Sequence, residues 1–134
     1  MSVALSTAVT GSDFDTVVAK TREALKDNGF GVLTEIDMQA TLKAKLGEEM
    51  ERYLILGACN PPLAHRAVTV EKRIGVLLPC NIVIREDVEH PGTVLVEAMN
   101  PALMAQVVDN PALAPIADEV SGKIGAVIDI LSGA

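Results

Sequence analysis

The fold is decided by "RYLILGACNPPLAHRAVTVEK" at residues 52–72 and by "IGVLLPCNIVIRE" at residues 74–86. An apolar run of strand length ends at Cys59, and Asn60-Pro61 opens about three turns of helix-forming sequence. The second stretch is predicted to be one long strand that contains Pro79 and a second Cys-Asn pair. Because proline removes one hydrogen-bond donor, this strand is expected at a sheet edge or at a bulge.

Toward the N-terminus, residues 3–9 alternate in polarity as a first strand does. A helix follows, for which Ser12 is the expected N-cap, and "FGVLTEI" forms a second strand. Asp37 is the expected cap of a short helix that Gly47 ends.

Toward the C-terminus, "DVEHPG" predicts a hairpin turn before a fifth strand, "TVLVEAM". The chain then repeats itself in "NPALM" at 100–104 and "NPALA" at 110–114, where each Asn is an expected N-cap. A last helix is predicted from about Pro115 to Leu131, and its Gly122 and Gly125 indicate close packing.

The predicted order is a strand, a helix, four further strands and a helix, with short helices between some strands. This order is typical of an α+β fold, with a mostly antiparallel sheet of about five strands and helices on one face. Parallel pairing of the third and fourth strands remains an alternative, because the helix between them is long enough for a crossover. At 134 residues the chain is predicted to form a single domain over residues 1–134.

The composition predicts an aliphatic core, because hydrophobic residues make up 49% of the chain and aromatic residues only 2%. A mean hydropathy of +0.34 is high for a small monomer. A buried interface between subunits would use the surplus, and two-fold dimers are the commonest assembly, so a homodimer is predicted.

A net charge of −7 disfavours nucleic acid and anionic membrane surfaces as partners, since both are negatively charged. No apolar run approaches the ~18 residues that a membrane span needs. The N-terminal "MSVALSTAVTGSDF" does not resemble a signal peptide, so a cytoplasmic protein with reduced thiols is expected.

Cys59 is the first candidate functional residue, because it precedes the N-terminus of a helix. The helix dipole and free N–H groups there favour an anion, and a thiol in such a position tends toward a lowered pKa and nucleophilic character. The alternative is a buried cysteine that packs as a small hydrophobic residue.

Cys80 fits the alternating apolar pattern of its strand and is expected in the core, although Pro79 indicates a local distortion. Asn60 has a sufficient role as N-cap, and Asn81 and His65 are further candidates for ligand binding. Cys59, His65 and Cys80 would suit a soft metal, but their spacing matches no established zinc pattern, so a metal or cofactor stays unknown.

Glu97 lies within the fifth strand, either exposed at an edge or buried with a raised pKa. A phosphate-binding glycine loop and a recognisable Ser-His-Asp signature are both missing from the sequence. No reaction is therefore predicted, and whether the protein is an enzyme stays open.

Four stretches resemble an uncharacterised bacterial and archaeal family, domain of unknown function 302: "GFGVLTEID" at 29–37, "ATLKAKLG" at 40–47, "YLILGACNPPLAHRA" at 53–67 and "IGVLLPCNIVIRE" at 74–86. The paired Cys-Asn motifs make the resemblance specific. It implies a TATA-binding-protein-like α+β arrangement and a dimer, but no activity.

Three functional hypotheses follow. The first is a binding module in which the Cys-Asn pairs hold a small anionic, sulfur-containing or soft-metal ligand. The second is a thiol redox or sulfur-transfer protein that uses Cys59, with Cys80 as the resolving thiol. The third is a structural or regulatory dimer without chemistry of its own.

Overall fold

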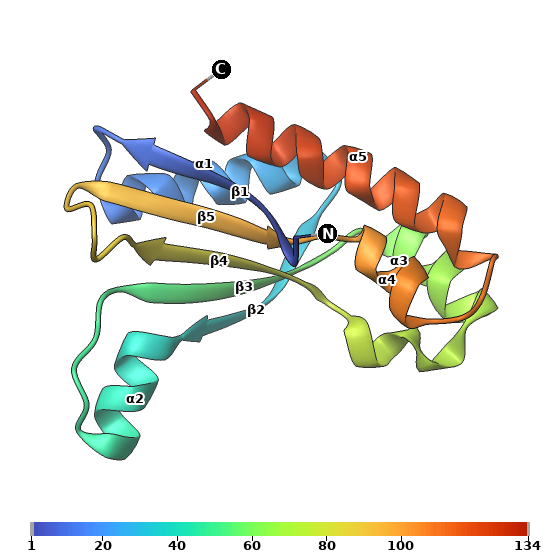
Figure 1. The fold of residues 1–134 in the computed structure, drawn as a ribbon, viewed down its shortest axis with the longest axis horizontal. Helices are drawn as coiled ribbons and strands as arrows, with labels where there is room; N and C mark the ends of the chain where they lie inside the picture. The colour runs from blue at the N-terminus through green and yellow to red at the C-terminus, as the bar shows by residue number, and fades with distance from the viewer. Residues whose placement is uncertain (1, 134) are drawn as a thin grey trace.

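The computed structural model describes residues 2–133. This part of the chain forms five strands, five α-helices and one 3₁₀ helix, η1 (Figure 1). Their bounds are β1 Ala4–Thr10, α1 Phe14–Asp27, β2 Gly31–Asp37, α2 Met38–Leu46, β3 Tyr53–Cys59, α3 Pro61–Val70, η1 Lys72–Leu77, β4 Cys80–Glu86, β5 Thr93–Met99, α4 Ala102–Val107 and α5 Leu113–Leu131.

The strands form one sheet in the order β1-β5-β4-β3-β2, and every neighbouring pair is antiparallel. This confirms the predicted α+β class and the predicted order of elements. The alternative of parallel pairing between the third and fourth strands is wrong. The segment of α3 and η1 returns the chain to the same end of the sheet instead of crossing it, so β4 runs back along β3.

The core lies between one face of the sheet and the helices α1 and α5 (Figure 1). Residues of β5 alternate between buried and half-buried, and Val94, Val96 and Ala98 point into the core. Helix α5 turns an apolar stripe toward the sheet, and all members of this stripe are buried. The stripe consists of Ile116, Val120, Ile124, Val127 and Leu131.

The opposite face of the sheet is not covered by α1 or α5 (Figure 1). Its apolar side chains are half-buried rather than buried, among them Ile55 on β3, Val83 on β4 and Leu95 on β5. Helix α2 projects beyond the β2–β3 edge and buries none of its residues. One face of the sheet is thus the wall of the core, and the other faces outward.

Several local predictions are confirmed by hydrogen bonds at the helix ends. Oδ1 of Asp37 accepts the N–H of Ala40 at 2.9 Å, and Gly47 ends α2 in the left-handed conformation, with φ of 69°. Such a φ favours glycine because it lacks a Cβ. The repeated motif is an exception, because the N-caps of α4 and α5 are Pro101 and Ala112 rather than the predicted Asn100 and Asn110. Oδ1 of each Asn instead accepts the N–H two residues further on, at 3.1 Å, in the turn before the helix.

Other local predictions are wrong. The N-cap of α1 is Asp13 rather than Ser12, since Oδ1 of Asp13 accepts the N–H of Thr16 at 2.7 Å. Gly122 and Gly125 do not mark close packing, because a Cβ built on either would meet nothing within 4 Å. The predicted long strand over 74–86 is also too long, because residues 72–77 form η1 and β4 begins at Cys80. Pro79 therefore precedes the strand and removes no donor from the sheet.

Candidate functional site

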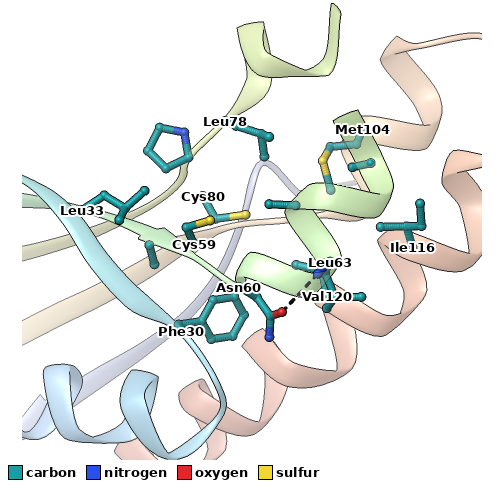
Figure 2. A pocket seen from close by; sticks show the side chains of 14 residues that line it. Phe30, Leu33, Cys59, Asn60, Leu63, Leu78, Cys80, Met104, Ile116 and Val120 are labelled. Atoms are coloured by element: carbon teal, nitrogen blue, oxygen red, sulfur yellow. Dashed lines mark hydrogen bonds between the residues drawn. The ribbon is translucent and has the colours of Figure 1, made fainter. Parts of the chain in front are cut away.

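A cavity of about 300 Å³ opens where β3 ends and β4 begins, next to helices α3, α4 and α5 (Figure 2). Both cysteines line it. They reach it from neighbouring strands, because Cys80 pairs with Ala58, the residue before Cys59. The lining consists of Phe30, Leu33, Ala58, Cys59, Asn60, Leu63, Ala64, Ala67, Leu78, Pro79, Cys80, Met104, Ile116 and Val120.

The start of α3 is built by Asn60 and two prolines. Oδ1 of Asn60 accepts the N–H of Leu63 at 3.2 Å, and the Asn60 carbonyl accepts the N–H of Ala64 at 2.8 Å (Figure 2). Pro61 and Pro62 have no N–H to donate. The expectation that free N–H groups after Cys59 would hold an anion is therefore wrong, since residues 61–64 leave no donor for a ligand.

The two thiols differ in their access to solvent. Cys59 is half-buried, whereas Cys80 is 5% exposed. Burial, with a further contribution from the charge that Cys59 carries as a thiolate, raises the pKa of the Cys80 thiol to about 11. At neutral pH Cys80 is therefore a protonated, uncharged thiol in the wall of the cavity, as the sequence predicted for a core residue.

No lysine, arginine, histidine or carboxylate is among the 14 residues that line the cavity. Asn60 supplies the polar side chain, and its Oδ1 is engaged in the helix cap. The remaining side chains are aliphatic or sulfur-containing, apart from the ring of Phe30. The site is therefore apolar, with polarisable sulfur atoms in its wall. An ionic ligand would find no side chain of opposite charge in it.

His65 and Asn81, both predicted to bind a ligand, lie outside the cavity. His65 is exposed on α3, and Asn81 is exposed on β4, where it pairs with Gly57. Strand alternation explains the position of Asn81: Cys80 and Asn81 are adjacent, so their side chains point to opposite faces of the sheet. The structure thus brings together Cys59, Asn60 and Cys80 and leaves the other two candidates outside.

Gly57 allows the segment before β4 to approach β3 closely. A Cβ built on Gly57 would overlap Oγ1 of Thr34 and would lie 2.7 Å from Cγ of Pro79. The Pro79 ring therefore packs over the backbone of β3, next to the two thiols. This contact fixes Leu78 and Pro79 as one wall of the cavity.

Most residues that line the cavity have no direct signal in the sequence. Leu33 reaches it because the register of β2 against β3 shifts between Val32 and Thr34, and a bulge of this kind has no marker in "GVLTE". Met104 ends the first "NPALM" motif, and that repeat was the available signal for it. Ile116 and Val120 belong to the apolar stripe of α5, and their helical spacing indicates a core face without any sign of a cavity.

Metal binding has little support from the geometry. Within residues 2–133 no group of three or more His, Cys, Asp or Glu side chains is arranged to hold a metal ion. Cys59 and Cys80 alone would offer two sulfur ligands, and Cys80 would have to lose a proton that its surroundings retain.

The fold and the site define an α+β protein in which an antiparallel five-stranded sheet carries an apolar cavity with two thiols at one end. Residues 5–131 match the sequence model of the domain of unknown function DUF302, and the chain belongs to this family. The family that the Cys-Asn motifs resemble is thereby confirmed.

Among solved structures, the chain is similar to an uncharacterized conserved DUF302 protein from Bacillus stearothermophilus, described from its crystal structure. The two are 24% identical, and the match covers 98% of this chain and 99% of that chain, with a TM-score of 0.88. This likeness shows the fold. No curated protein matches the sequence. Within the described residues, no helix is both long and apolar enough to span a membrane.

Proposed function

We propose that the protein is a binding module for a small, uncharged and largely apolar ligand that contains sulfur, held in the cavity beside Cys59 and Cys80. The observation that carries this proposal is that two free thiols from adjacent strands line one otherwise apolar cavity of about 300 Å³. Ligand sites are commonly concave and apolar with a few polar groups that fix orientation, and this cavity has that composition.

Three ligand classes were compatible with the sequence, and the site favours one of them. An anion would lack both free backbone N–H groups at the start of α3 and a positively charged side chain. A soft metal would require ionised thiols, of which Cys80 is protonated at neutral pH. A neutral thiol or thioether would bury its carbon chain and place its sulfur near two polarisable sulfur atoms.

Native mass spectrometry of the protein as isolated tests whether a ligand is carried through purification. Thermal unfolding in the presence of hexanethiol, dipropyl sulfide, inorganic phosphate or Cu(I) then separates the classes. The proposal expects the first two to raise the Tm and phosphate to have no effect, because a ligand that binds the folded state stabilises it. An apo mass combined with no shift from either sulfur compound would contradict it.

Two substitutions on α3 provide a matched pair for this experiment. Ala64→Leu adds apolar volume inside the cavity and should abolish the thermal shift, whereas His65→Leu lies on the exposed side of the same helix and should preserve it. Asn81→Ala should likewise leave binding unchanged. Loss of binding in the His65 or Asn81 variants would instead place the ligand outside the cavity.

A second candidate function is thiol redox chemistry, favoured by a half-buried Cys59 in front of a buried Cys80. The Cys59 thiolate would attack a hydroperoxide, forming a sulfenic acid and releasing an alkoxide that is protonated to the alcohol. The Cys80 thiol would then attack that sulfur, form the disulfide and release water. This function ranks second, because the high pKa of Cys80 slows the second step.

Mass spectrometry after peroxide treatment separates this candidate from the first. A disulfide between Cys59 and Cys80, lost in Cys80→Ser, would support it. Oxidation of Cys59 to sulfinic acid without any disulfide would remove Cys80 as a resolving thiol and leave the binding function standing.

We also propose that the chain assembles as a homodimer and resides in the cytoplasm. The surplus of apolar residues and a sheet face that α1 and α5 leave uncovered support the dimer. Two cysteines that form no disulfide fit a reducing compartment.

The third candidate function is a structural dimer without chemistry of its own. In that case the Cys59→Ser and Cys80→Ser variants would keep every measurable binding and redox property.

A further inference from the structure

The outward face of the sheet carries apolar side chains on four strands, grouped around the pair of Arg85 and Glu97. Ile36, Ile55 and Val83 follow one another across β2, β3 and β4, because Ile36 pairs with Ile55 and Ile55 with Val83. Tyr53, Leu95 and Met99 extend the set, and every one of these side chains is half-buried or exposed. We call this set of six side chains the outer patch.

The charge of the outward face is balanced, although the chain as a whole has a net charge of −7. Strand alternation and the pairing of the strands place two charged strand residues on this face in the described chain, Arg85 on β4 and Glu97 on β5. Nε of Arg85 donates to Oε1 of Glu97 at 2.6 Å, and both side chains are 29% exposed. Glu97 is therefore neither exposed at a sheet edge nor buried, as the two sequence alternatives had it, because β5 lies between β1 and β4 and the side chain is half-buried beside Arg85.

We infer that the outer patch is the surface through which two copies of this chain associate, with the sheets face to face. This inference rests on the proposed homodimer and names its interface. A face that holds one cation beside one anion is complementary to itself under a two-fold axis, because residue i then meets residue j and residue j meets residue i. Arg85 of each copy would lie near Glu97 of the other.

The size of the face agrees with a second copy as occupant. Five strands about 4.8 Å apart, each seven residues long at about 3.4 Å per residue, span roughly 24 by 24 Å, or about 570 Å² before side-chain relief is counted. Stable interfaces bury about 800 Å² on each partner, a figure that includes side-chain relief as well as flat area, so the face is of the same order of size.

A neutral face is also the part of an acidic molecule at which two copies meet with least repulsion. Like charges on approaching surfaces oppose association, and the excess carboxylates of this chain lie elsewhere. A nucleic acid or an anionic membrane would gain no attraction from the outward face, because the charges of Arg85 and Glu97 cancel.

Charge reversal gives a test in which repulsion is introduced and then removed. In the Arg85→Glu variant, a carboxylate at position 85 of each copy would face the partner's Glu97. In the Glu97→Arg variant, a cation at position 97 of each copy would face the partner's Arg85. Each variant alone should therefore be monomeric. When the two variants are mixed, both contacts between subunits become attractive, and a heterodimer should form. Sedimentation velocity with one variant carrying a dye measures this directly, and far-UV circular dichroism checks that each variant is folded.

Two further variants complete the design. Val83→Glu places a charge at the centre of the outer patch and should dissociate the dimer, whereas Val107→Glu changes a valine on α4 that is 68% exposed and should not. A monomeric wild type would overturn both the homodimer and its interface. A dimeric wild type that is unaffected by Val83→Glu and by both charge reversals would overturn the interface alone. Neither result bears on ligand binding in the cavity, which is tested separately.

Discussion

Gly57 on β3 lies so close to Pro79 that a Cβ on the glycine would be 2.7 Å from Cγ of the proline. The same Cβ would overlap Oγ1 of Thr34, so a hydrogen is the side chain that fits. Gly57 stands two residues before Cys59, and Pro79 directly precedes Cys80. The contact thus joins the two segments that carry the thiols, and the shape of the cavity depends on it.

Gly57→Ala should lower the free energy of unfolding by about 1–3 kcal/mol, because overpacking forces neighbouring groups to move. Displacement of the Pro79 segment should also make Cys80 react faster with a thiol reagent in the folded state. Urea denaturation and labelling of the folded protein measure the two effects.

Gly122→Ala is the control for this substitution. Its Cβ would meet nothing within 4 Å on α5, so stability should be unchanged or rise by up to about 1 kcal/mol through better helix propensity. Equal stability changes in the Gly57 and Gly122 variants would show that Pro79 and Thr34 yield without strain.

Asn60→Ala should destabilise the protein by about 1 kcal/mol, because it removes the acceptor for the N–H of Leu63 at the start of α3. Asn60→Ser retains a side-chain oxygen at the N-cap and should recover most of the loss. Urea denaturation of the three proteins is the measurement. If serine were no better than alanine, the contribution of Asn60 would come from packing and not from its hydrogen bond.

The fold was predictable where local chemistry determines it. Alternation places β5, the capping side chains of Asn60 and Asp37 start two helices, and Gly47 ends one. The order of strands and helices followed from these signals. Residues 72–79 were not predictable in the same way, because an apolar run that continues into β4 has the same composition whether it forms a 3₁₀ helix or a strand.

The candidate site was predictable only in its cysteines and the helix cap between them. Cys59 and Asn60 follow from a strand that runs into a helix, and the second Cys-Asn pair marked Cys80. Asn81 was predicted as the second member of that pair, yet it lies inside a strand, where alternation turns its side chain outward. The bulge at Leu33 and the approach of Met104 depend on tertiary packing, which a local pattern does not encode.

The two thiols should react at different rates in the folded protein. Cys59 is half-buried and Cys80 is 5% exposed, so iodoacetamide should alkylate Cys59 first, and Cys80 should react only when the structure opens. Peptide mass spectrometry at several times identifies the modified residue. In Cys59→Ser the fast phase should vanish, and its persistence would show that Cys80 is accessible.

Cys80 should make the stability of the protein fall at alkaline pH. The pKa of this thiol rises from 9.0 to about 11 on folding, chiefly through burial. Below pH 9 both states keep the proton, so the contribution to stability is complete. Between about pH 9 and 11 the unfolded chain loses its proton first, which favours unfolding, and the loss reaches roughly 2–3 kcal/mol above pH 11.

Other groups also titrate in this range, so the measurement compares the wild type with Cys80→Ala by urea denaturation at several values between pH 8 and 11. The difference in unfolding free energy between the two proteins should shrink as the pH rises, because alanine has no proton to lose and shares the remaining titrations. A constant difference would show that the Cys80 thiol ionises as readily in the folded protein as in the unfolded chain. The wall of the cavity would then be hydrated, and an apolar ligand would lose the dry surface on which the proposed binding depends.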